Sequence, residues 1–386
     1  MQKIFQFFFV VIGIIVILTA CSPQVKFEPS GMITPSVDKT ISTEFTPPTS
    51  VPATLSLPSL TSSPTKVTSP TPTSVPHTVI AFTGVIVPAR CVQAEIDRQG
   101  RADYIYDEVR DILESADITV GTYNAVMSDQ VEPVGCEHSW ELVGSPVNAD
   151  ALQRAGFDVM SVATNHIMDC GKQSCGTTAF FDTLLHLKRV GILPVGAGRN
   201  LADAKKPVIV EVNGLRFGFV SLGEVNEKVF ANAVTPGIAE LTLENLNSAI
   251  AEAREAADVV IVLPHSGPED YPEMTPQQNF WARHSVEAGA NLVVINHAHI
   301  VQGYQWMGEV PVFYSLGNFV FDQVWARDHQ QGMILLVTFE GVKIIEFELI
   351  PTVVDQDGTV HLANGEEKEE ILSRVEELSK ILNNGG

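Results

Sequence analysis

From residue 79 onward, short apolar runs alternate with segments whose apolar residues recur at helical spacing. The runs of strand length lie at 79–87, 118–122, 159–163, 217–222, 259–263 and 292–295. The amphipathic segments between them lie at 104–115, 148–155, 177–190, 243–256 and 276–288. This alternation predicts an α/β fold, in which polar residues gather at the carboxyl ends of the strands.

The C-terminal part of the chain follows a different pattern. Apolar stretches at 312–315, 333–339 and 342–350 have no helical segment between them, which predicts antiparallel strands. Residues 366–384 carry apolar side chains at helical spacing, so we expect a terminal amphipathic helix there.

The N-terminus has the features of a bacterial export signal. An apolar run at 4–19 follows Lys3, and small residues precede Cys21. This pattern predicts a lipoprotein signal at 1–21 with a lipidated Cys21, which would anchor the chain to the cell membrane. The alternative is an uncleaved anchor helix, and both interpretations place the rest of the chain outside the cytoplasm.

A segment rich in serine, threonine and proline separates this signal from the alternating region. Of the 57 residues from 22 to 78, 34 are Ser, Thr or Pro. Such a composition cannot build an apolar core, so we expect a disordered tether here and a globular domain at 79–386.

The charge of the chain restricts its partners. The formal net charge is -22, and residues 79–386 contain 43 acidic and 20 basic residues. Because nucleic-acid binding depends on basic surfaces, we expect no nucleic-acid partner. An anionic surface polymer would also need a local site, such as a metal pocket or Arg90, to overcome this mean charge.

Four cysteines lie in the expected domain: Cys91, Cys136, Cys170 and Cys175. In an oxidising compartment they could form disulfides, and four cysteines allow three pairings. Cys170 with Cys175 would close a small loop and Cys91 with Cys136 a larger one, whereas free buried cysteines are the alternative.

Three loops that follow expected strands concentrate metal-ligand residue types. They carry Asn165 and His166, His265, and the pair His297 and His299. Each histidine alone could be a hydrogen-bonded structural residue, but three such loops at strand ends predict convergence on one cation.

Several segments resemble those of a known family. Residues 155–159 lead into 163–171, residues 287–290 lead into 296–299, and Tyr-Ser-Leu-Gly-Asn-Phe-Val-Phe-Asp follows at 314–322. Over 79 to about 350 the chain resembles the CapA-type capsule or poly-γ-glutamate biosynthesis proteins, a branch of the calcineurin-like metallophosphoesterases. The resemblance implies a four-layer α/β/β/α sandwich with a dinuclear metal centre at the strand ends.

The resemblance also implies roles for individual residues. Asn165, His265 and His297 match the ligands of one metal, and His299 matches a ligand of the second. His166 matches a residue that would protonate a leaving alkoxide, and Arg90 matches a basic residue that could steady an anionic substrate. Two cations and a nearby imidazole suit phosphoryl chemistry.

The sequence departs from the family pattern at both carboxylate ligands. Val85 stands where the family has Asp, and Asn124 stands where it has a bridging Glu. Because two cations repel without a bridging anion, we expect one divalent ion, Mn, Zn or Fe, held by Asn165, His265, His297 and Asn124, or no ion at all. Replacement by Asp169, Glu224 or Glu269 is the alternative, and nothing in the sequence places these acids at the site.

Three hypotheses on function follow. The first is an envelope protein for capsule or poly-γ-glutamate-type polymer biosynthesis or attachment that keeps a metallophosphoesterase-like site without those carboxylates. The loss of these two ligands argues against activity as a metal-dependent phosphoesterase. The second is a noncatalytic lipoprotein that binds the polymer or its biosynthetic machinery. The third is a solute-binding lipoprotein, which would have two similar α/β lobes.

Overall fold

The computed structural model describes residues 77–172 and 174–384. The predicted signal at 1–21, the predicted lipidation at Cys21 and almost all of the predicted tether at 22–78 lie outside the described residues. The first strand begins at His77, two residues before the expected start of the domain.

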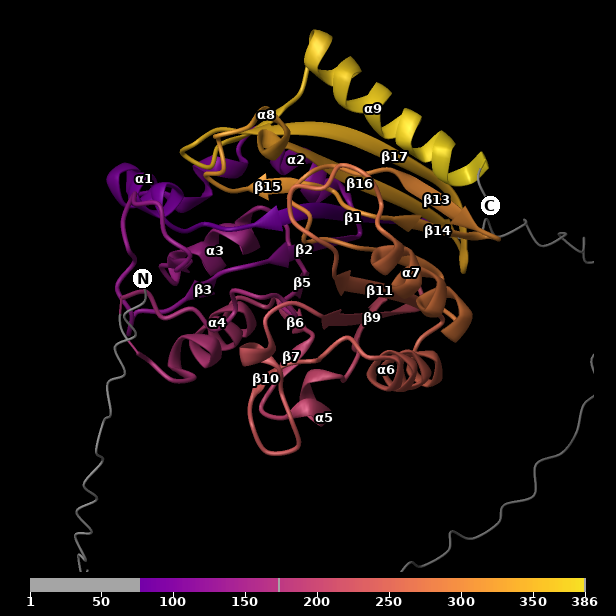
Figure 1. Cartoon of the computed structure of the whole chain (residues 1–386), viewed down its shortest axis with the longest axis horizontal. Coiled ribbons are helices and arrows are strands. Elements are labelled where there is room, and N and C mark those ends of the chain that lie inside the picture. Colours follow the sequence, from indigo (N-terminus) through magenta and orange to yellow (C-terminus); the bar gives the residue numbers. More distant parts are fainter. Residues whose placement is uncertain (1–76, 173, 385–386) are drawn as a thin grey trace, which may run out of the picture. The chain divides into compact units, whose positions relative to one another are not determined.

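Two mixed sheets form the centre of the fold (Figure 1). The first has the order β18-β17-β16-β1-β2-β5-β6, and β15 pairs with the end of β1. Strands β1, β2, β5 and β6 run parallel, whereas β16, β17 and β18 are antiparallel. Its strands are β1 (His77–Ile86), β2 (Ile118–Tyr123), β5 (Val159–Ser161), β6 (Leu193–Val195), β15 (Asn318–Val320), β16 (Gln331–Glu340), β17 (Lys343–Val354) and β18 (Val360–Leu362).

The second sheet has the order β13-β14-β12-β11-β9-β8. Its four central strands are parallel, and an antiparallel strand lies at each edge. Its strands are β8 (Val208–Val212), β9 (Leu215–Gly223), β11 (Val259–His265), β12 (Leu292–Val294), β13 (Tyr304–Met307) and β14 (Val310–Phe313). Two short pairs lie outside the sheets: β3 (Val126–Met127) with β4 (Val143–Gly144), and β7 (Ala197–Gly198) with β10 (Gly237–Ile238).

Helices cover the outer face of each sheet. A core of buried apolar residues joins the first sheet to α1 (Cys91–Gln99), α2 (Arg110–Ser115), α3 (Val147–Arg154) and α4 (Thr178–Arg189). Another joins the second sheet to α5 (Leu201–Ala204), α6 (Leu243–Ala256) and α7 (Pro276–Ala288). The predicted four-layer α/β/β/α sandwich is therefore confirmed.

The inner faces of the two sheets pack against each other. Ile80 and Phe82 of β1 belong to the same buried cluster as Phe217 and Phe219 of β9. On β1 the intervening Ala81 faces the helices instead. Because the central strands are buried on both faces, they read as continuous apolar runs in the sequence.

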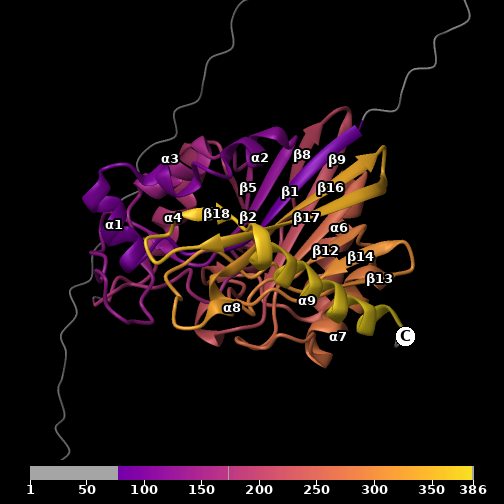
Figure 2. The same ribbon diagram turned by 90° about the horizontal axis from the view of Figure 1, so that it is seen from above.

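The chain ends in the long helix α9 (Gly365–Asn384), close to the expected range. Figure 2 shows α9 lying along β17, with β13 and β14 nearby. Ile371 and Val375 are buried in the core between the sheets, and Ser379 Oγ accepts a hydrogen bond from the Tyr304 backbone N–H at 2.9 Å. The helix is therefore an integral part of the sandwich.

One expected helix was wrong in detail. The helix expected at 104–115 is a 3₁₀ turn (Ala102–Tyr106) followed by the short α2. Its buried residues Ile105, Val109 and Leu113 keep helical spacing, but Val109 N–H donates to Tyr106 O, an i→i−3 bond, so the α-helix is interrupted. The sequence analysis also did not anticipate α1 or β8.

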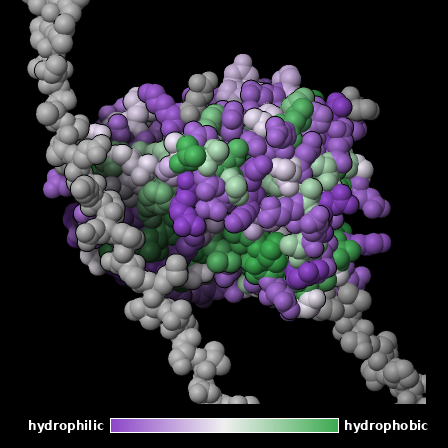
Figure 3. All heavy atoms as spheres, turned by 90° about the horizontal axis from the view of Figure 1, so that it is seen from below, coloured by the Kyte–Doolittle hydropathy of each residue, from purple (hydrophilic) through white to green (hydrophobic). Residues whose placement is uncertain are grey.

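Nearly all acidic side chains of the described domain lie outside its core. Figure 3 shows one face on which hydrophilic side chains predominate and hydrophobic ones gather in patches. Among the residues whose burial is described, Asp322 is the only buried acidic residue, so the excess negative charge is a surface property. In the described part of the chain, no helix has both the length and the apolar character needed to cross a bilayer.

Candidate metal site

The carboxyl ends of strands from both sheets meet at one edge of the sandwich. A bridge pairs His265, the last residue of β11, with Asn296 in the loop after β12. Asn296 Nδ2 donates to Thr122 Oγ1 of β2 at 2.9 Å, and this bond links the two sheets. The loops that carry the predicted ligands are therefore brought together by strand register.

His265, Asn165 and His297 form a buried group at this edge. His265 Nε2 lies 3.0 Å from Asn165 Oδ1, and the ring centroids of His265 and His297 are 4.6 Å apart. Within the described residues, Nδ1 of each ring has no hydrogen-bond partner. Burial lowers the pKa of His265 well below its ordinary value and lowers the pKa of His297 to about 3. Both rings are therefore neutral at pH 7, as metal ligation by imidazole requires.

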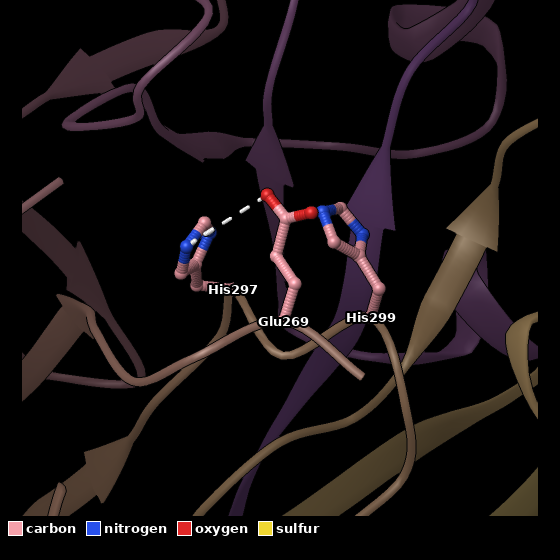
Figure 4. Close-up of side chains that lie close together, drawn as sticks. All are labelled: Glu269, His297 and His299. Carbon is pink, nitrogen blue, oxygen red and sulfur yellow. Dashed lines mark ion pairs between the residues drawn. The ribbon is translucent and has the colours of Figure 1, made fainter. Parts of the chain in front are cut away.

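Glu269 joins His297 and His299 in a second group of potential ligands. One ligand atom from each of the three residues lies within 4.8 Å of the others. Figure 4 shows the Glu269 carboxylate between the two rings, and its Oε1 is 4.0 Å from His297 Nε2. Burial raises the pKa of Glu269, which indicates a site that favours a compensating cation at neutral pH.

A hydrogen bond fixes the orientation of the His299 ring. Asn318 Nδ2 donates to Gln323 Oε1 and to His329 O, so Asn318 Oδ1 is left to accept from His299 Nδ1 at 2.7 Å. The lone pair of His299 then lies on Nε2. Such an outer partner is the usual way that proteins orient a metal-ligating imidazole.

Backbone strain is also concentrated here. The φ angles of His297 and His299 are 137° and 60°, in a region that non-glycine residues seldom adopt. Strain of this kind persists only when surrounding structure imposes it, and it clusters at functional sites.

His166 lies at the same edge and is held through both its backbone and its ring. Its backbone N–H donates to Asn124 Oδ1 at 3.1 Å, and its Nδ1 lies 2.8 Å from Asp169 Oδ2. Asp169 Oδ2 also accepts from Leu142 N–H, so this acid orients the ring and does not reach the other histidines as a ligand. His166 lines a pocket together with Glu269 and His299.

Arg90 contacts an acid instead of lying free at the site. Its guanidinium pairs with Asp322 through Nε and Nη2, and Nη1 donates to Ser139 O at 2.7 Å. Both side chains are 5% exposed, so Asp322 neutralises the charge of Arg90. The role of Arg90 in steadying a substrate stays a prediction, and its contacts favour a structural role.

The two positions that lack the family's carboxylates are also ordered. Val85 is fully buried between β2 and β15, and its N–H donates to Gly317 O at 2.9 Å. Asn124 is fully buried, and within the described residues its Nδ2 has no hydrogen-bond partner. Neither position supplies an anion between the ligand groups.

Glu269 is the site residue that the sequence analysis did not place. The available signal was its position four residues after His265, in the same strand-end loop. Glu224, considered with it, has another function: it accepts hydrogen bonds from Gly267 N–H at 3.0 Å and from Trp281 Nε1 at 2.6 Å. Glu224 therefore anchors the loop that carries Glu269.

Two disulfides lie on the first sheet's side of this edge. The structure joins Cys91 to Cys136 and Cys170 to Cys175. The first ties the start of α1, next to Arg90, to the loop that contains Ser139.

Comparison with known proteins identifies the family. A model described as "Bacterial capsule synthesis protein PGA_cap" matches residues 79–323, more than half of the chain. The chain belongs to this family. It is 31% identical over 256 residues to the PGA biosynthesis protein CapA of Bacillus subtilis (strain 168), a match that covers 66% of each chain.

Other relatives agree with this assignment. The capsule biosynthesis protein CapA of Bacillus anthracis is 31% identical over 264 residues, which cover 66% of this chain and 62% of the relative. The chain thus spans slightly less than two thirds of these two PGA_cap relatives. Among solved structures, a hypothetical protein from Thermus thermophilus is similar with a TM-score of 0.45 and 14% identity, over 71% of this chain and 98% of that one.

Proposed function

We propose that this PGA_cap protein acts outside the cytoplasm in the biosynthesis or attachment of a capsule or poly-γ-glutamate-type surface polymer. Membership of the capsule synthesis family supports this role, and the export signal and lipidation expected at Cys21 support the location. Its partners would be the polymer or the machinery that makes it, and the membrane through the lipid anchor.

The site fits one divalent ion better than two. Glu269, His297 and His299 supply a carboxylate and two neutral imidazoles, a donor set that suits Zn or Mn. Asn165 and His265 lie beside His297 and would complete or orient the ligand shell. With Val85 and Asn124 at the matched positions, Glu269 is the single carboxylate left for this group of ligands, too little negative charge to balance two ions, so a dinuclear centre is disfavoured.

The observation that carries the proposal of a one-ion site is the position of Glu269. It brings a carboxylate to the two histidines from a different loop than the family's Asp and Glu would use. A bound ion would supply Lewis-acid polarisation of an ester or acyl oxygen. His166, whose Nδ1 contacts Asp169, presents its other nitrogen for proton transfer.

A noncatalytic polymer-binding role is the second candidate. The buried Val85 and the neutral Asn124 favour it, because they remove the ligands that a two-metal hydrolase would need. The solute-binding alternative is not retained: the described residues form one sandwich with a shared core between the sheets, instead of two similar lobes.

The two candidates are separated by replacing the gene in its host with variants and measuring surface polymer. Loss of the gene should abolish or reduce the polymer in both cases. If the metal site acts in catalysis, His297→Ala should reproduce this loss at normal protein levels. If the chain is a scaffold, His297→Ala should leave the polymer at the wild-type amount. Normal polymer after deletion of the gene would contradict both.

A direct activity measurement complements the genetics. The purified chain is assayed on a phosphomonoester and a phosphodiester with Mn or Zn, beside a Val85→Asp, Asn124→Glu double variant. We expect little turnover by the natural chain on these simple esters and a gain in the variant. Two bound ions and efficient turnover in the natural chain would overturn the one-ion proposal.

A further inference from the structure

Exposed aromatic side chains surround the pocket that contains the candidate metal ligands. The aromatic rim consists of His138, Trp140 and Trp325. Trp140 is 70% exposed and Trp325 is 56% exposed, and both line the same pocket as Glu269 and His299. Large aromatic side chains at the mouth of a pocket are characteristic of ligand binding, because water contact with their faces is unfavourable until a ligand covers them.

The members of the rim contact one another. The His138 ring lies 6.2 Å from the Trp140 ring in an edge-on arrangement and 5.8 Å from the Trp325 ring. The Trp325 ring also lies 5.6 Å from the ring of the buried His329. Residues from two distant segments thus form one continuous aromatic surface.

Covalent and polar contacts hold in place the loop at 136–142, which carries His138 and Trp140. The disulfide between Cys91 and Cys136 fixes its start, and Arg90 Nη1 binds Ser139 O. Its end is fixed where Leu142 N–H donates to Asp169 Oδ2, the same oxygen that contacts His166. Such a pre-formed surface loses little conformational entropy when it binds a ligand.

The charges around the rim argue against an anionic ligand. The pocket is lined by the carboxylates of Glu269 and Asp270, whereas the guanidinium of Arg90 is neutralised by Asp322. No lysine among the described residues lines this pocket, and the domain has a strong excess of acids. Apart from an ion bound at Glu269, the pocket offers neither a lysine nor an unpaired arginine to the carboxylates of a γ-linked glutamate chain.

We infer that the aromatic rim is a binding subsite for uncharged saccharide rings of the surface polymer, placed beside the candidate metal ligands. A pyranose ring has an apolar C–H face that can cover an indole ring and hydroxyl groups that can bind the polar atoms of the pocket. This inference rests on the proposed function, which makes a surface polymer the source of the ligand. Of the two kinds of polymer named there, the aromatic rim favours a polysaccharide over polyglutamate.

The test is saccharide binding by the intact chain, measured by calorimetry and tryptophan fluorescence. The probes are a tetramer of N-acetylglucosamine, maltohexaose and a γ-linked glutamate oligomer of similar length. We expect at least one of the two saccharides to bind, and Trp140→Ala or Trp325→Ala to weaken that binding about tenfold. The glutamate oligomer should not bind.

The matched control is Trp306→Ala, because Trp306 is 41% exposed on β13 and does not line this pocket. It should leave saccharide binding unchanged, and circular dichroism would establish that all three variants are folded. The inference is overturned if neither saccharide binds, if only the glutamate oligomer binds, or if the rim variants behave like the control.

The measurement is repeated in excess chelator to separate this subsite from the metal proposal. Saccharide binding that persists in chelator supports the rim even if no metal site exists. Binding that disappears in chelator and is insensitive to both rim substitutions would assign it to the metal and overturn the rim.

Discussion

The buried pair of Arg90 and Asp322 shows how a residue identified by resemblance acquires another role in the fold. Asp322 accepts hydrogen bonds from two guanidinium nitrogens of Arg90 and from the backbone N–H of Cys91. The Arg90 guanidinium also lies over the Phe321 ring, 5.0 Å from its centroid. These contacts join the first strand–helix loop to the segment after β15. Removing one partner would leave an uncompensated buried charge.

We therefore predict that Arg90→Ala lowers the free energy of unfolding by about 3–5 kcal/mol. Arg98→Ala is the control, because its ion pair with Glu95 lies on the surface, and it should cost far less stability than Arg90→Ala. Urea unfolding of the two variants checks this. Equal stabilities of the two variants would show that the Arg90 pair contributes no more than a surface pair.

At the scale of single residues, the sequence analysis named the imidazoles of the candidate metal site as ligands but did not place its carboxylate. Asn165, His265 and His297 lie together because each is at or just after the end of a strand, and strand ends can be found from apolar runs. Glu269 lies in a loop whose path depends on positive φ angles at Gly267 and Asp270. Tertiary contacts such as those of Glu224 define that path, and no local pattern reports them.

Among the elements, α9 offers a direct test of packing. Ile371 is fully buried against the core between the sheets, whereas Ile381 on the same helix is 64% exposed. Ile371→Ala should lower the free energy of unfolding by about 2–5 kcal/mol, because it removes buried methyl groups and leaves a cavity.

Ile381→Ala is the matched control for this prediction. The same substitution at an exposed site of the same helix should change stability by no more than about 0.5 kcal/mol. Denaturant unfolding of both variants would reveal the difference. If Ile371→Ala matched the control, α9 would not be packed as the structure shows.

Sequence patterns are sufficient to predict the bounds of some helices and not of others. Residues 243–256 and 276–288 were predicted as helices from apolar spacing, with the bounds that the structure has. In the structure, a capping box between Thr275 and Gln278 begins α7. Residues 104–115 were not, because apolar spacing cannot distinguish a continuous helix from a 3₁₀ turn followed by a short one. Pairing between β15 and β1 likewise depends on long-range contacts.

For the whole molecule, the buried histidines predict a dependence of stability on pH. In the metal-free protein the pKa of His297 is lowered to about 3 and that of His299 to about 4, mainly by burial. The unfolded chain therefore binds more protons than the folded chain below pH 6.5, so stability is lost as pH falls. Each such histidine should cost about 1 to 1.5 kcal/mol between pH 7.5 and 5.5.

Urea unfolding in chelator at these two pH values checks this prediction. His297→Gln should reduce the loss of stability on acidification. Burial lowers the pKa of His361, but hydrogen bonds and charge interactions with Glu108 and Asp355 together outweigh it and raise the pKa, so the contribution of His361 is present at low pH and lost as pH rises. His361→Gln should therefore increase the loss of stability on acidification. Equal pH dependence in the wild type and His297→Gln would contradict a neutral buried His297.

The most direct test of the one-ion site is the number of Zn or Mn ions bound per chain, with their affinity, measured by elemental analysis and calorimetry. We predict one ion in the wild type, a loss of affinity of at least about tenfold in Glu269→Gln, and no change in Glu273→Gln, an exposed glutamate of the same loop. Two ions per chain, or equal affinity in both variants, would contradict a single metal held by Glu269, His297 and His299.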